Sequence, residues 1–367
     1  MTYSLPVVDG KKRSAPVVRT LTPGGGAGFH GASRASGRRS LVDSYGRRIR
    51  DLRLSLTDRC NFRCVYCMDP DVRFMRKIEL LTDSEMVRLV RICAGLGVRR
   101  LRLTGGEPTL HPTLLELIAD LRAVGVDDIA MTTNGSVASR DDLRALKDAG
   151  LDRLSVSIDT LREDRFAQIT RSTSSVARVL KTIEDARDAG LAPVKVNVVV
   201  MRGFNDDEVE DLAALARTYG VDVRLIEYMP LDSGRRWSME QVVTADEMIA
   251  RIGAVYPLAP IGRERRNSPA TGYGFADGAP GRIGVIASVS KPFCGACSRL
   301  RVTADGKVMP CLFSREEWDL RPLLRGGASD EDIAGALAEA TWSKQAGGLI
   351  ATTDYSGESR PMSAIGG

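Results

Sequence analysis

Hydrophobic and polar residues alternate along this chain in a way that predicts strands and helices in turn from Leu52 onward. Short runs in which every second residue is apolar, or in which β-branched residues dominate, are typical of strands. Amphipathic stretches between these runs favour helices, and several of them end at a glycine, as helix C-termini often do. Six runs are predicted as strands: 52–56, 99–104, 127–133, 152–159, 194–200 and 221–228.

This alternation predicts βαβ units and a parallel sheet. Six units indicate an α/β fold, a partial (β/α)6 barrel of the triose-phosphate-isomerase type, because too little chain remains for eight. After about residue 232 the pattern loosens into Gly-, Pro- and Arg-rich loops. We therefore expect a disordered basic leader at 1–45, the barrel core at 46–232, and a C-terminal region at 233–367 that closes the open side. Ligands of such folds bind at the C-terminal ends of the strands, so we expect the functional motifs there.

The composition is that of a globular protein of 367 residues, with 43% hydrophobic and 27% charged residues. The formal charge of +5 comes from the leader, where seven Lys and Arg face two Asp; the rest of the chain is balanced. The leader reads as a disordered tail, with an organelle transit sequence as the alternative. A folded nucleic-acid-binding face is not supported, and no run of apolar residues is long enough to span a membrane.

Three cysteines, Cys60, Cys64 and Cys67, follow the first predicted strand with the spacing C-x3-C-x2-C. Three thiolates this close together can ligate three irons of a 4Fe–4S cluster and leave the fourth iron without a protein ligand. A structural zinc site would need a fourth ligand, yet the only histidines of the chain are His30 and His111. The incomplete set favours an open, reactive cluster over a closed structural site.

The cysteine motif, with the aromatic Tyr66 before its last cysteine, resembles that of the radical S-adenosylmethionine (SAM) superfamily. The resemblance implies that the open iron holds the amino and carboxylate groups of SAM. The segment "TGGEP" at the end of the second predicted strand strengthens it. There, Gly105 and Gly106 permit close backbone approach, and Glu107 can accept hydrogen bonds from the SAM ammonium group.

A second set of three cysteines, Cys294, Cys297 and Cys311, is spaced C-x2-C-x13-C and again lacks a fourth ligand. A cluster with a purely structural or relay role is normally capped by four ligands, so this one is expected to bind substrate. Arg299 and Arg301 follow in "SRLR". Beside an open iron these two side chains are better explained as an anion clamp than as a solvated charged strand.

Both motifs, "SRLR" and the C-terminal "MSAIGG" together resemble the molybdenum cofactor biosynthesis protein A family, the GTP 3′,8-cyclases, over roughly residues 45 to 367. The resemblance implies two 4Fe–4S clusters and SAM as cofactors, and GTP as substrate. It implies that a 5′-deoxyadenosyl radical takes hydrogen from C3′ of GTP, that C3′ bonds to C8, and that (8S)-3′,8-cyclo-7,8-dihydroguanosine 5′-triphosphate forms. That reaction is the first step of molybdenum cofactor biosynthesis.

The resemblance also assigns roles to individual residues. The expected SAM contacts are Tyr66, Gly105, Gly106, Glu107, Ser157 and Met229. The expected GTP contacts are Arg53, Arg102, Thr133, Lys195, Arg299, Leu300 and Arg301. Arg299, Arg301, Gly366 and Gly367 are expected to act in catalysis.

The alternation of side chains along a strand independently supports the roles of Arg53 and Arg102. Both alternate with leucines and so face away from the side on which those leucines pack. Other assigned residues have plainer readings: Ser157 as a strand end, Met229 as core, and the glycine tail as a frayed terminus.

Two rival functions stay open at this point: a radical SAM enzyme that acts on a peptide, and a non-catalytic metal-binding or scaffold protein. Seven cysteines in an odd, clustered arrangement indicate metal binding in a reducing compartment, and we expect the cytoplasm. The partners implied by the family are an electron donor of unknown identity and a downstream cyclic pyranopterin monophosphate synthase. Neither nucleic acid nor a membrane is expected, and the choice between monomer and homodimer is open.

Overall fold

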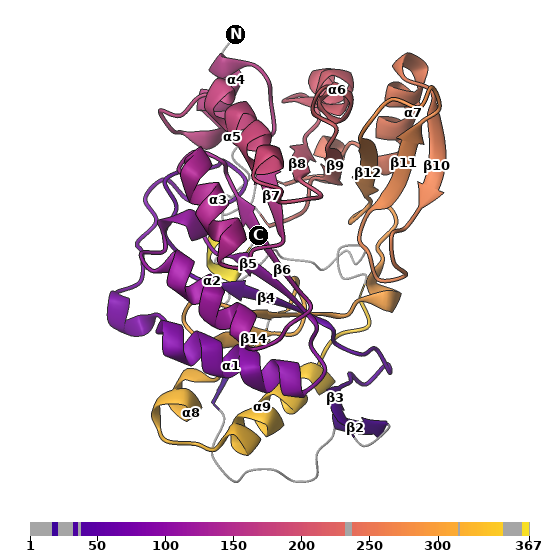
Figure 1. Cartoon of the computed structure of the whole chain (residues 1–367). Coiled ribbons are helices and arrows are strands. Elements are labelled where there is room, and N and C mark those ends of the chain that lie inside the picture. The colour runs from indigo at the N-terminus through magenta and orange to yellow at the C-terminus, as the bar shows by residue number, and fades with distance from the viewer. Residues whose placement is uncertain are drawn as a thin grey trace.

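The structure is a computed structural model that describes residues 17–20, 32–35, 38–231, 237–314, 316–347 and 362–366. Its centre is a row of parallel strands that follow one another in chain order and agree closely with the six predicted ones. These strands are β4 (Asp51–Ser55), β5 (Arg100–Thr104), β6 (Asp128–Thr133), β7 (Arg153–Ser157), β8 (Lys195–Val200) and β9 (Asp222–Glu227). The sheet curls into an open half-barrel, so the prediction of an α/β partial barrel is confirmed (Figure 1).

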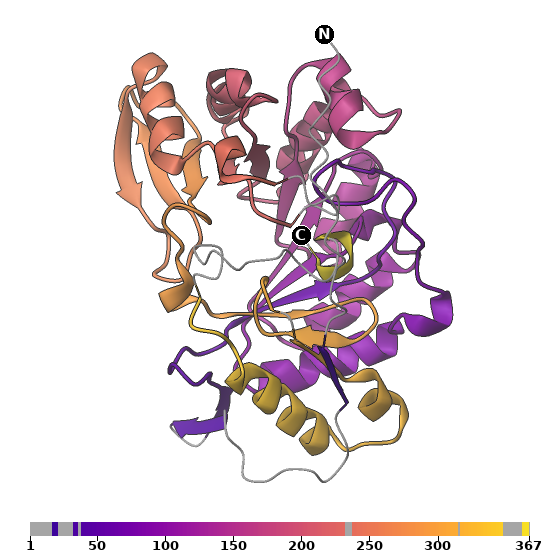
Figure 2. The same cartoon turned by 180° about the vertical axis from the view of Figure 1, so that it is seen from behind.

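Helices cover the outer face of this sheet, and neighbouring helices pack side by side (Figures 1 and 2). They are α1 (Asp83–Gly95), α2 (Leu114–Ala123), α3 (Arg140–Asp148), α4 (Glu163–Thr170), α5 (Val176–Asp188) and α6 (Val209–Tyr219). In α1 the Thr82 hydroxyl accepts a bond from the Glu85 backbone N–H, which caps the first turn. The apolar stripe of that helix, which includes Cys93, is buried against the strands.

The C-terminal region adds strands to both edges of the half-barrel. On one edge β12 (Arg282–Ile286) pairs in parallel with β9 and is followed by β11 (Thr271–Phe275) and β10 (Leu258–Gly262). On the other, β13 (Arg299–Val302) pairs in parallel with β4 and is followed by β14 (Lys307–Met309) and β15 (Glu316–Asp319). The helices of this region are α7 (Ala245–Val255), α8 (Arg321–Arg325), α9 (Asp330–Trp342) and α10 (Met362–Ile365).

Much of the expected leader lies outside the described residues, but its last part is folded. Strand β1 (Val17–Thr20) pairs with β15, and β2 (Ala32–Ala35) pairs with β3 (Arg38–Leu41). Leu41 is completely buried, and Asp43 forms an ion pair with Arg47 in which both side chains are almost inaccessible. Residues 38–45 are therefore part of the folded structure, because an apolar side chain and a buried ion pair anchor them.

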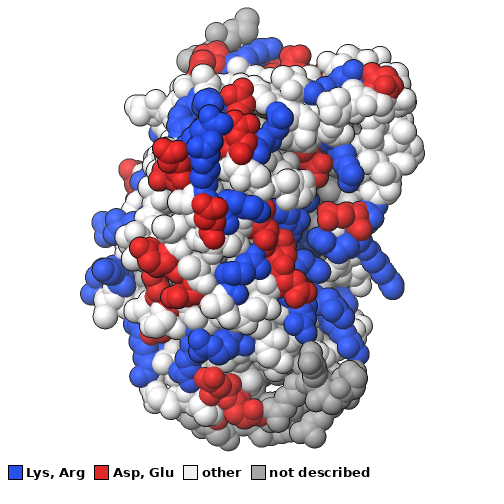
Figure 3. Space-filling view, viewed as in Figure 1, with Lys and Arg blue, Asp and Glu red and all other residues white. Residues whose placement is uncertain are grey.

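The surface carries charges of both signs. On the face shown in Figure 3, basic and acidic side chains are interspersed and do not form one extended basic surface. Within the described residues, no helix combines the length and the apolar character needed to cross a membrane.

Candidate functional site

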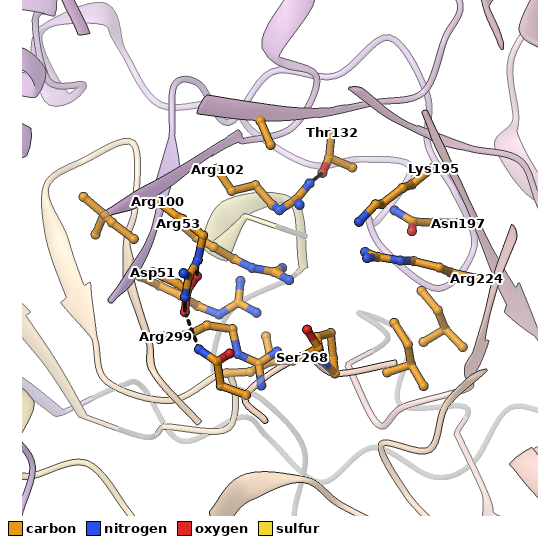
Figure 4. A pocket seen from close by; sticks show the side chains of 18 of the residues that line it. Asp51, Arg53, Arg100, Arg102, Thr132, Lys195, Asn197, Arg224, Ser268 and Arg299 are labelled. Carbon is orange, nitrogen blue, oxygen red and sulfur yellow. Dashed lines mark hydrogen bonds and ion pairs between the residues drawn. The ribbon is translucent and has the colours of Figure 1, made fainter. Parts of the chain in front are cut away.

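A cavity of about 210 Å³ lies on the inner side of the curled sheet (Figure 4). Strands from β13 through β9 contribute side chains to it, and so does the loop at 265–269. The lining is strongly basic. Its basic members are Arg53, Arg100, Arg102, Arg153, Lys195, Arg224, Arg265, Arg299 and Arg301, and its acidic members are Asp51 and Asp128.

Strand alternation explains why these cations point inward. In β4 the leucines on either side of Arg53 are fully buried in the core, whereas Arg53 is half-buried and faces the cavity. The same alternation holds in β5 around Arg102 and in β9 around Arg224. Of the expected GTP contacts, Arg53, Arg102, Lys195, Arg299 and Arg301 all line this cavity.

Sequence reasoning missed Arg100, Arg153, Arg224 and Arg265. Two of these are neutralised inside the protein, because Arg100 pairs with Asp51 and Arg153 pairs with Asp128. Arg224 could have been found from sequence, since "DVRLIE" shows the same alternation as the strands of Arg53 and Arg102.

Several of the remaining cations lack a carboxylate partner. Arg102 donates to the hydroxyls of Thr132 and Ser155 at 3.1 and 3.2 Å, while Arg53 and Arg224 have no hydrogen-bonding partner among the described residues. Burial, helped by the neighbouring arginines, lowers the pKa of Arg53 well below its usual value, and burial lowers the pKa of Arg102 to about 10. Positive charges that are partly removed from water and lack an anion are costly, so the cavity is suited to a ligand with several negative charges.

The positions of the motifs along the strands correct one expectation. The first cysteine set follows β4 and therefore lies at the C-terminal ends of the strands, as predicted. Asp51, Arg100 and Lys195, however, are the first residues of their strands, so the cavity extends through the interior toward the opposite ends. Ligand space inside the barrel exists because an open half-barrel leaves its interior unfilled, whereas a closed eight-stranded barrel packs it with side chains.

The second cysteine set lies at those opposite ends. Cys294 and Cys297 precede β13, which runs parallel to β4 with Arg299 opposite Asp51. Strand β14 is antiparallel to β13, so Cys311, which follows β14, returns to the same end. The two cysteine sets are therefore about one strand length apart, roughly 15–20 Å, at opposite ends of one cavity.

Cavity residues adjoin both sets. Phe293 and Leu312, the immediate neighbours of Cys294 and Cys311, line one end of the cavity. Met362 lines it too, and the backbone of the next residue, Ser363, opposes the effect of burial on the pKa of the Cys67 thiol at the other end.

The three cysteines of the first set lie close enough to influence one another. Burial, followed by the charge of Cys60, raises the pKa of Cys67 to about 12. Burial and the other two thiols raise the pKa of Cys64 well above its usual value. Cys60 Sγ accepts weak bonds from the Phe62 backbone N–H and from the Asn134 side-chain amide, at 3.4 and 3.8 Å. Thiolates crowded in this way need a cation beside them, and cluster irons provide one.

Beside this set, Glu107 is held by an internal network. Its Oε1 accepts bonds from the Thr133 hydroxyl at 2.7 Å and from the backbone N–H and hydroxyl of Thr109. Its Oε2 accepts from the Asn134 backbone N–H at 2.7 Å, the only bond to that oxygen among the described residues, so capacity for an ammonium donor remains there. The role of Glu107 in binding SAM stays a prediction.

The same network explains where Thr133 lies. Its hydroxyl donates to Glu107 and its side chain is buried, so it does not line the cavity. The cavity is lined instead by Thr132, on the other face of β6. Leu300 is likewise fully buried between two cavity arginines, which leaves only its backbone for a ligand. Because successive side chains of a strand point to opposite faces, Thr133 and Leu300 face away from the cavity, while the residues next to them in the sequence face it.

The backbone of "GGE" packs so closely against a neighbouring segment that neither of its glycines could carry a side chain. A Cβ on Gly105 would lie 2.4 Å from the Thr57 carbonyl oxygen, and a Cβ on Gly106 would lie 2.2 Å from that of Arg59. The strand end is thus pressed against the segment that leads to Cys60, as the sequence predicted.

We expect Gly106→Ala to destabilise the protein by about 1–3 kcal/mol and to impair iron binding at the first cysteine set, because the Arg59 backbone must move. Urea unfolding and iron analysis measure the two effects. Gly95→Ala is the control, since a Cβ there meets no heavy atom within 4 Å. A Gly106→Ala protein with the stability and iron content of the parent would contradict this prediction.

Tyr66 is fixed next to the first set by Asp159, whose Oδ2 accepts a hydrogen bond from the Tyr66 hydroxyl at 2.5 Å. Burial raises the pKa of Asp159 to about 6, and it raises the pKa of Tyr66 well above 10. Ser157 ends β7, and Met229 lines the cavity just after β9. The SAM contacts of these residues stay predictions.

The second set has a different electrostatic setting. Burial opposes ionisation of Cys297, but the charges of Arg299 and Lys344 outweigh it and lower the pKa of this thiol to about 6. Arg299 also lies over the Phe293 ring, with its guanidinium carbon 4.6 Å from the ring centroid. Thiolates and guanidinium groups thus share one end of the cavity.

The C-terminal segment, α10 and Gly366, lies beside the site. Helix α10 lies near the centre of the molecule in both views (Figures 1 and 2). The carbonyl oxygen of Gly366 accepts a hydrogen bond from the Arg301 guanidinium. Gly366 has a φ of +77°, and a Cβ there would lie 2.4 Å from Thr104 Oγ1 and 2.5 Å from Ser55 Oγ. Only glycine fits this notch; Gly367 lies outside the described residues.

The donor sets fit iron–sulfur clusters. All seven cysteines are free thiols, and the six that the two motifs supply are partly accessible, while Cys93 is buried. Within the described residues, no three His, Cys, Asp or Glu side chains are gathered around the position of a single metal ion. The members of each set nevertheless interact through their charges, as three ligands spread around one cluster would.

Comparisons with known proteins agree with this geometry. Residues 54–216 match the Radical SAM superfamily, and residues 221–349 match Molybdenum Cofactor Synthesis C. A GTP 3′,8-cyclase of Streptomyces coelicolor is 47% identical over 92% of this chain and 98% of its own length. A GTP 3′,8-cyclase of Mycolicibacterium smegmatis is 44% identical over 95% of this chain and 98% of its own.

Among solved structures, Streptococcus suis SuiB bound to the precursor peptide SuiA aligns with a TM-score of 0.59 at 11% identity, over 85% of this chain and 68% of that one. SuiB bound to S-adenosylmethionine aligns with a TM-score of 0.56 at 12% identity, over 75% and 61%. At such low identity these likenesses show a shared fold only.

Proposed function

This chain belongs to the GTP 3′,8-cyclase family of the radical SAM superfamily, and from that membership we propose how its cavity carries out the reaction. The enzyme converts GTP to (8S)-3′,8-cyclo-7,8-dihydroguanosine 5′-triphosphate, the first step of molybdenum cofactor biosynthesis. Two 4Fe–4S clusters and SAM are its cofactors. The observation that carries our proposal is the placement of one three-cysteine set at each end of a single basic cavity.

We assign the first cluster to Cys60, Cys64 and Cys67, and the second to Cys294, Cys297 and Cys311. SAM then lies at the C-terminal ends of the strands, near Tyr66 and Met229. GTP lies between the two sets, inside the basic cavity. The expected SAM contacts in full are Tyr66, Gly105, Gly106, Glu107, Ser157 and Met229.

The triphosphate is assigned to the cations that lack a carboxylate partner or have only a distant one. Arg53 and Arg224 have no hydrogen-bonding partner among the described residues, and Lys195 meets Glu264 only at 3.5 Å. A triphosphate carries roughly three to four negative charges, and guanidinium groups bind its oxygens bidentately. Binding GTP would thus neutralise positive charges for which the described residues supply no carboxylate or only a distant one.

When bound, the first cluster and SAM supply the radical chemistry that starts formation of the C3′–C8 bond; the chain's residues bind and orient GTP for it. Arg299 holds the nucleotide near the second cysteine set. Arg301 fixes the carbonyl of Gly366, so the tail fills the space beside the strand ends and excludes water. Gly367 is proposed to act with Gly366.

The assay that tests this proposal is anaerobic incubation of reconstituted protein with SAM, reductant and GTP. We expect about eight irons per chain, 5′-deoxyadenosine release that depends on GTP, and the cyclised nucleotide as product. ATP and an unrelated peptide serve as competing substrates. Release driven by the peptide but not by GTP would move the enzyme to the peptide-acting class, and zinc without iron would favour a non-catalytic metal protein.

A further prediction concerns pH. Burial and the charge of Arg224 lower the pKa of Lys195 to about 8, so the free enzyme loses this positive charge as pH rises through that value. Binding a triphosphate favours the protonated lysine. Below about pH 8 the charge is already present, whereas above it binding must take up a proton. The affinity for GTP should therefore fall by up to about tenfold per pH unit between about pH 8 and about pH 9.

Equilibrium binding of GTP across this range measures the effect, and Lys195→Arg is the matched variant because its guanidinium stays charged. We expect the variant to lose the fall in affinity near pH 8. An equal fall in both proteins would assign the titration to another group.

The remaining partners follow from family membership. We propose a one-electron reductant, and a cyclic pyranopterin monophosphate synthase as the protein that takes the product. We also place the enzyme in the cytoplasm, a proposal supported by its seven unpaired thiols.

A further inference from the structure

Lys344 is a buried ammonium group that the reaction described above does not use. Its side chain is only 3% exposed, and it lies two residues after the end of α9. Its Nζ donates to the carbonyl oxygen of Arg299 at 2.9 Å and to that of Pro310. Among the described residues, no carboxylate lies within ion-pair distance of it.

The two carbonyls hold the ammonium group between the two chain segments that carry the cysteines of the second set. Arg299 lies two residues after Cys297, and Pro310 lies directly before Cys311. Lys344 therefore bridges the start of β13 and the end of β14, the two strand ends that carry these ligands. Its charge acts on both thiols, since it lowers the pKa of Cys297 and opposes the effect of burial on Cys311.

The segment that carries Lys344 is held in place independently. Arg47, paired with Asp43, donates to the carbonyl oxygens of Cys294 and Ala346, both at 2.8 Å. Gly347 lies against Cys294, where a Cβ would be 2.0 Å from the cysteine Cβ. Two separate contacts thus fix this segment against the second set, so the ammonium group cannot swing out to solvent without breaking them.

Burying a cation costs free energy unless a negative charge lies beside it. A 4Fe–4S cluster held by three thiolates has a net charge of about −1 when oxidised and about −2 after one-electron reduction. The second cluster would supply the missing negative charge. A fixed cation beside it favours the reduced form, because that form carries more negative charge.

We propose that Lys344 is the counter-cation of the second cluster and raises its reduction potential. This inference rests on the proposed assignment of that cluster to Cys294, Cys297 and Cys311. Lys344 acts through the cluster and the strand ends, so it is a positioning and tuning residue that does not touch GTP.

The test is an EPR-monitored redox titration of the reconstituted holoenzyme. The second cluster's signal is identified as the one that persists when Cys60, Cys64 and Cys67 are alanine. Lys344→Gln keeps donors for the two carbonyls but removes the charge, and Lys344→Arg keeps the charge. At a fixed potential we expect the Gln variant to show about a tenfold lower ratio of reduced to oxidised second cluster, which equals about 59 mV. The Arg variant should match the parent.

Lys291→Met is the control, because this lysine is close in sequence to Cys294 but 62% exposed and paired with Asp246, where solvent screens its charge. An unchanged ratio in Lys344→Gln, or equal shifts in the Gln and Arg variants, would overturn the proposal. Should the Gln variant fail to load the second cluster while the Arg variant loads it, the charge is required and the proposal stands.

If neither Lys344 variant loads the second cluster, Lys344 is a structural staple and the proposal fails. Parent protein with only about four irons would instead count against the cluster assignment itself.

Discussion

Replacing Gly366 with alanine is expected to lower GTP turnover roughly hundredfold while both clusters stay in place. The backbone there is left-handed, and the new Cβ would lie 2.4 Å from Thr104 Oγ1 and 2.5 Å from Ser55 Oγ. Residue 366 must therefore leave its notch, and Arg301 loses the carbonyl that it holds. Turnover under saturating GTP and SAM, with iron analysis of the same samples, measures the effect.

Two further variants make this test specific. Gly253→Ala is the control, since a Cβ on that glycine of α7 meets no heavy atom within 4 Å. Removing the two hydroxyls with Ser55→Ala and Thr104→Ala should restore part of the lost turnover, because Ser55 Oγ has no hydrogen-bond partner to lose. Undiminished turnover in Gly366→Ala would show that docking of the tail is not needed for the reaction.

The second large effect is expected at the arginines of β13, for which we propose different tasks. Arg299 lines the cavity over Phe293, so Arg299→Ala should weaken GTP binding by roughly ten- to a hundredfold through loss of a charge-assisted contact. Arg301 donates to Gly366, so Arg301→Ala should lower kcat more than affinity. Equilibrium binding of GTP and steady-state rates separate the two.

In the double variant, GTP binding should be weakened while SAM still binds at the first cluster, which lies at the other end of the cavity. Arg144→Ala removes an exposed arginine of α3 and controls for the loss of charge. Parent-like affinity for GTP in the double variant would exclude the anion clamp.

The six central strands could be predicted from sequence because each buries alternate apolar residues on a sheet covered by helices. The C-terminal strands could not. Strands β13 and β14 are only four and three residues long, and their partners lie far away in the sequence, so no local pattern reveals that they extend the sheet of β4.

The site residues could be predicted where a motif fixes their spacing. They were harder to predict where the face of a strand determines whether a side chain reaches the cavity. The cysteine sets and the inward arginines followed from spacing and alternation. Thr132 and Thr133 are adjacent threonines, and only the pairing of β6 determines which one faces the cavity. Lys344 gave no sequence signal, because its role depends on two carbonyl groups brought together by folding.

The pairing of β13 with β4 also bears on how the polypeptide is made. Asp51 emerges early from the ribosome, yet its partner Arg299 emerges only after most of the barrel. Until then β4 is an unprotected sheet edge, and contacts this distant in sequence form slowly. We therefore expect nascent chains to rely on chaperones and to aggregate when the protein is overproduced. Variants with an additional charged side chain on the exposed edge of β4 should aggregate less.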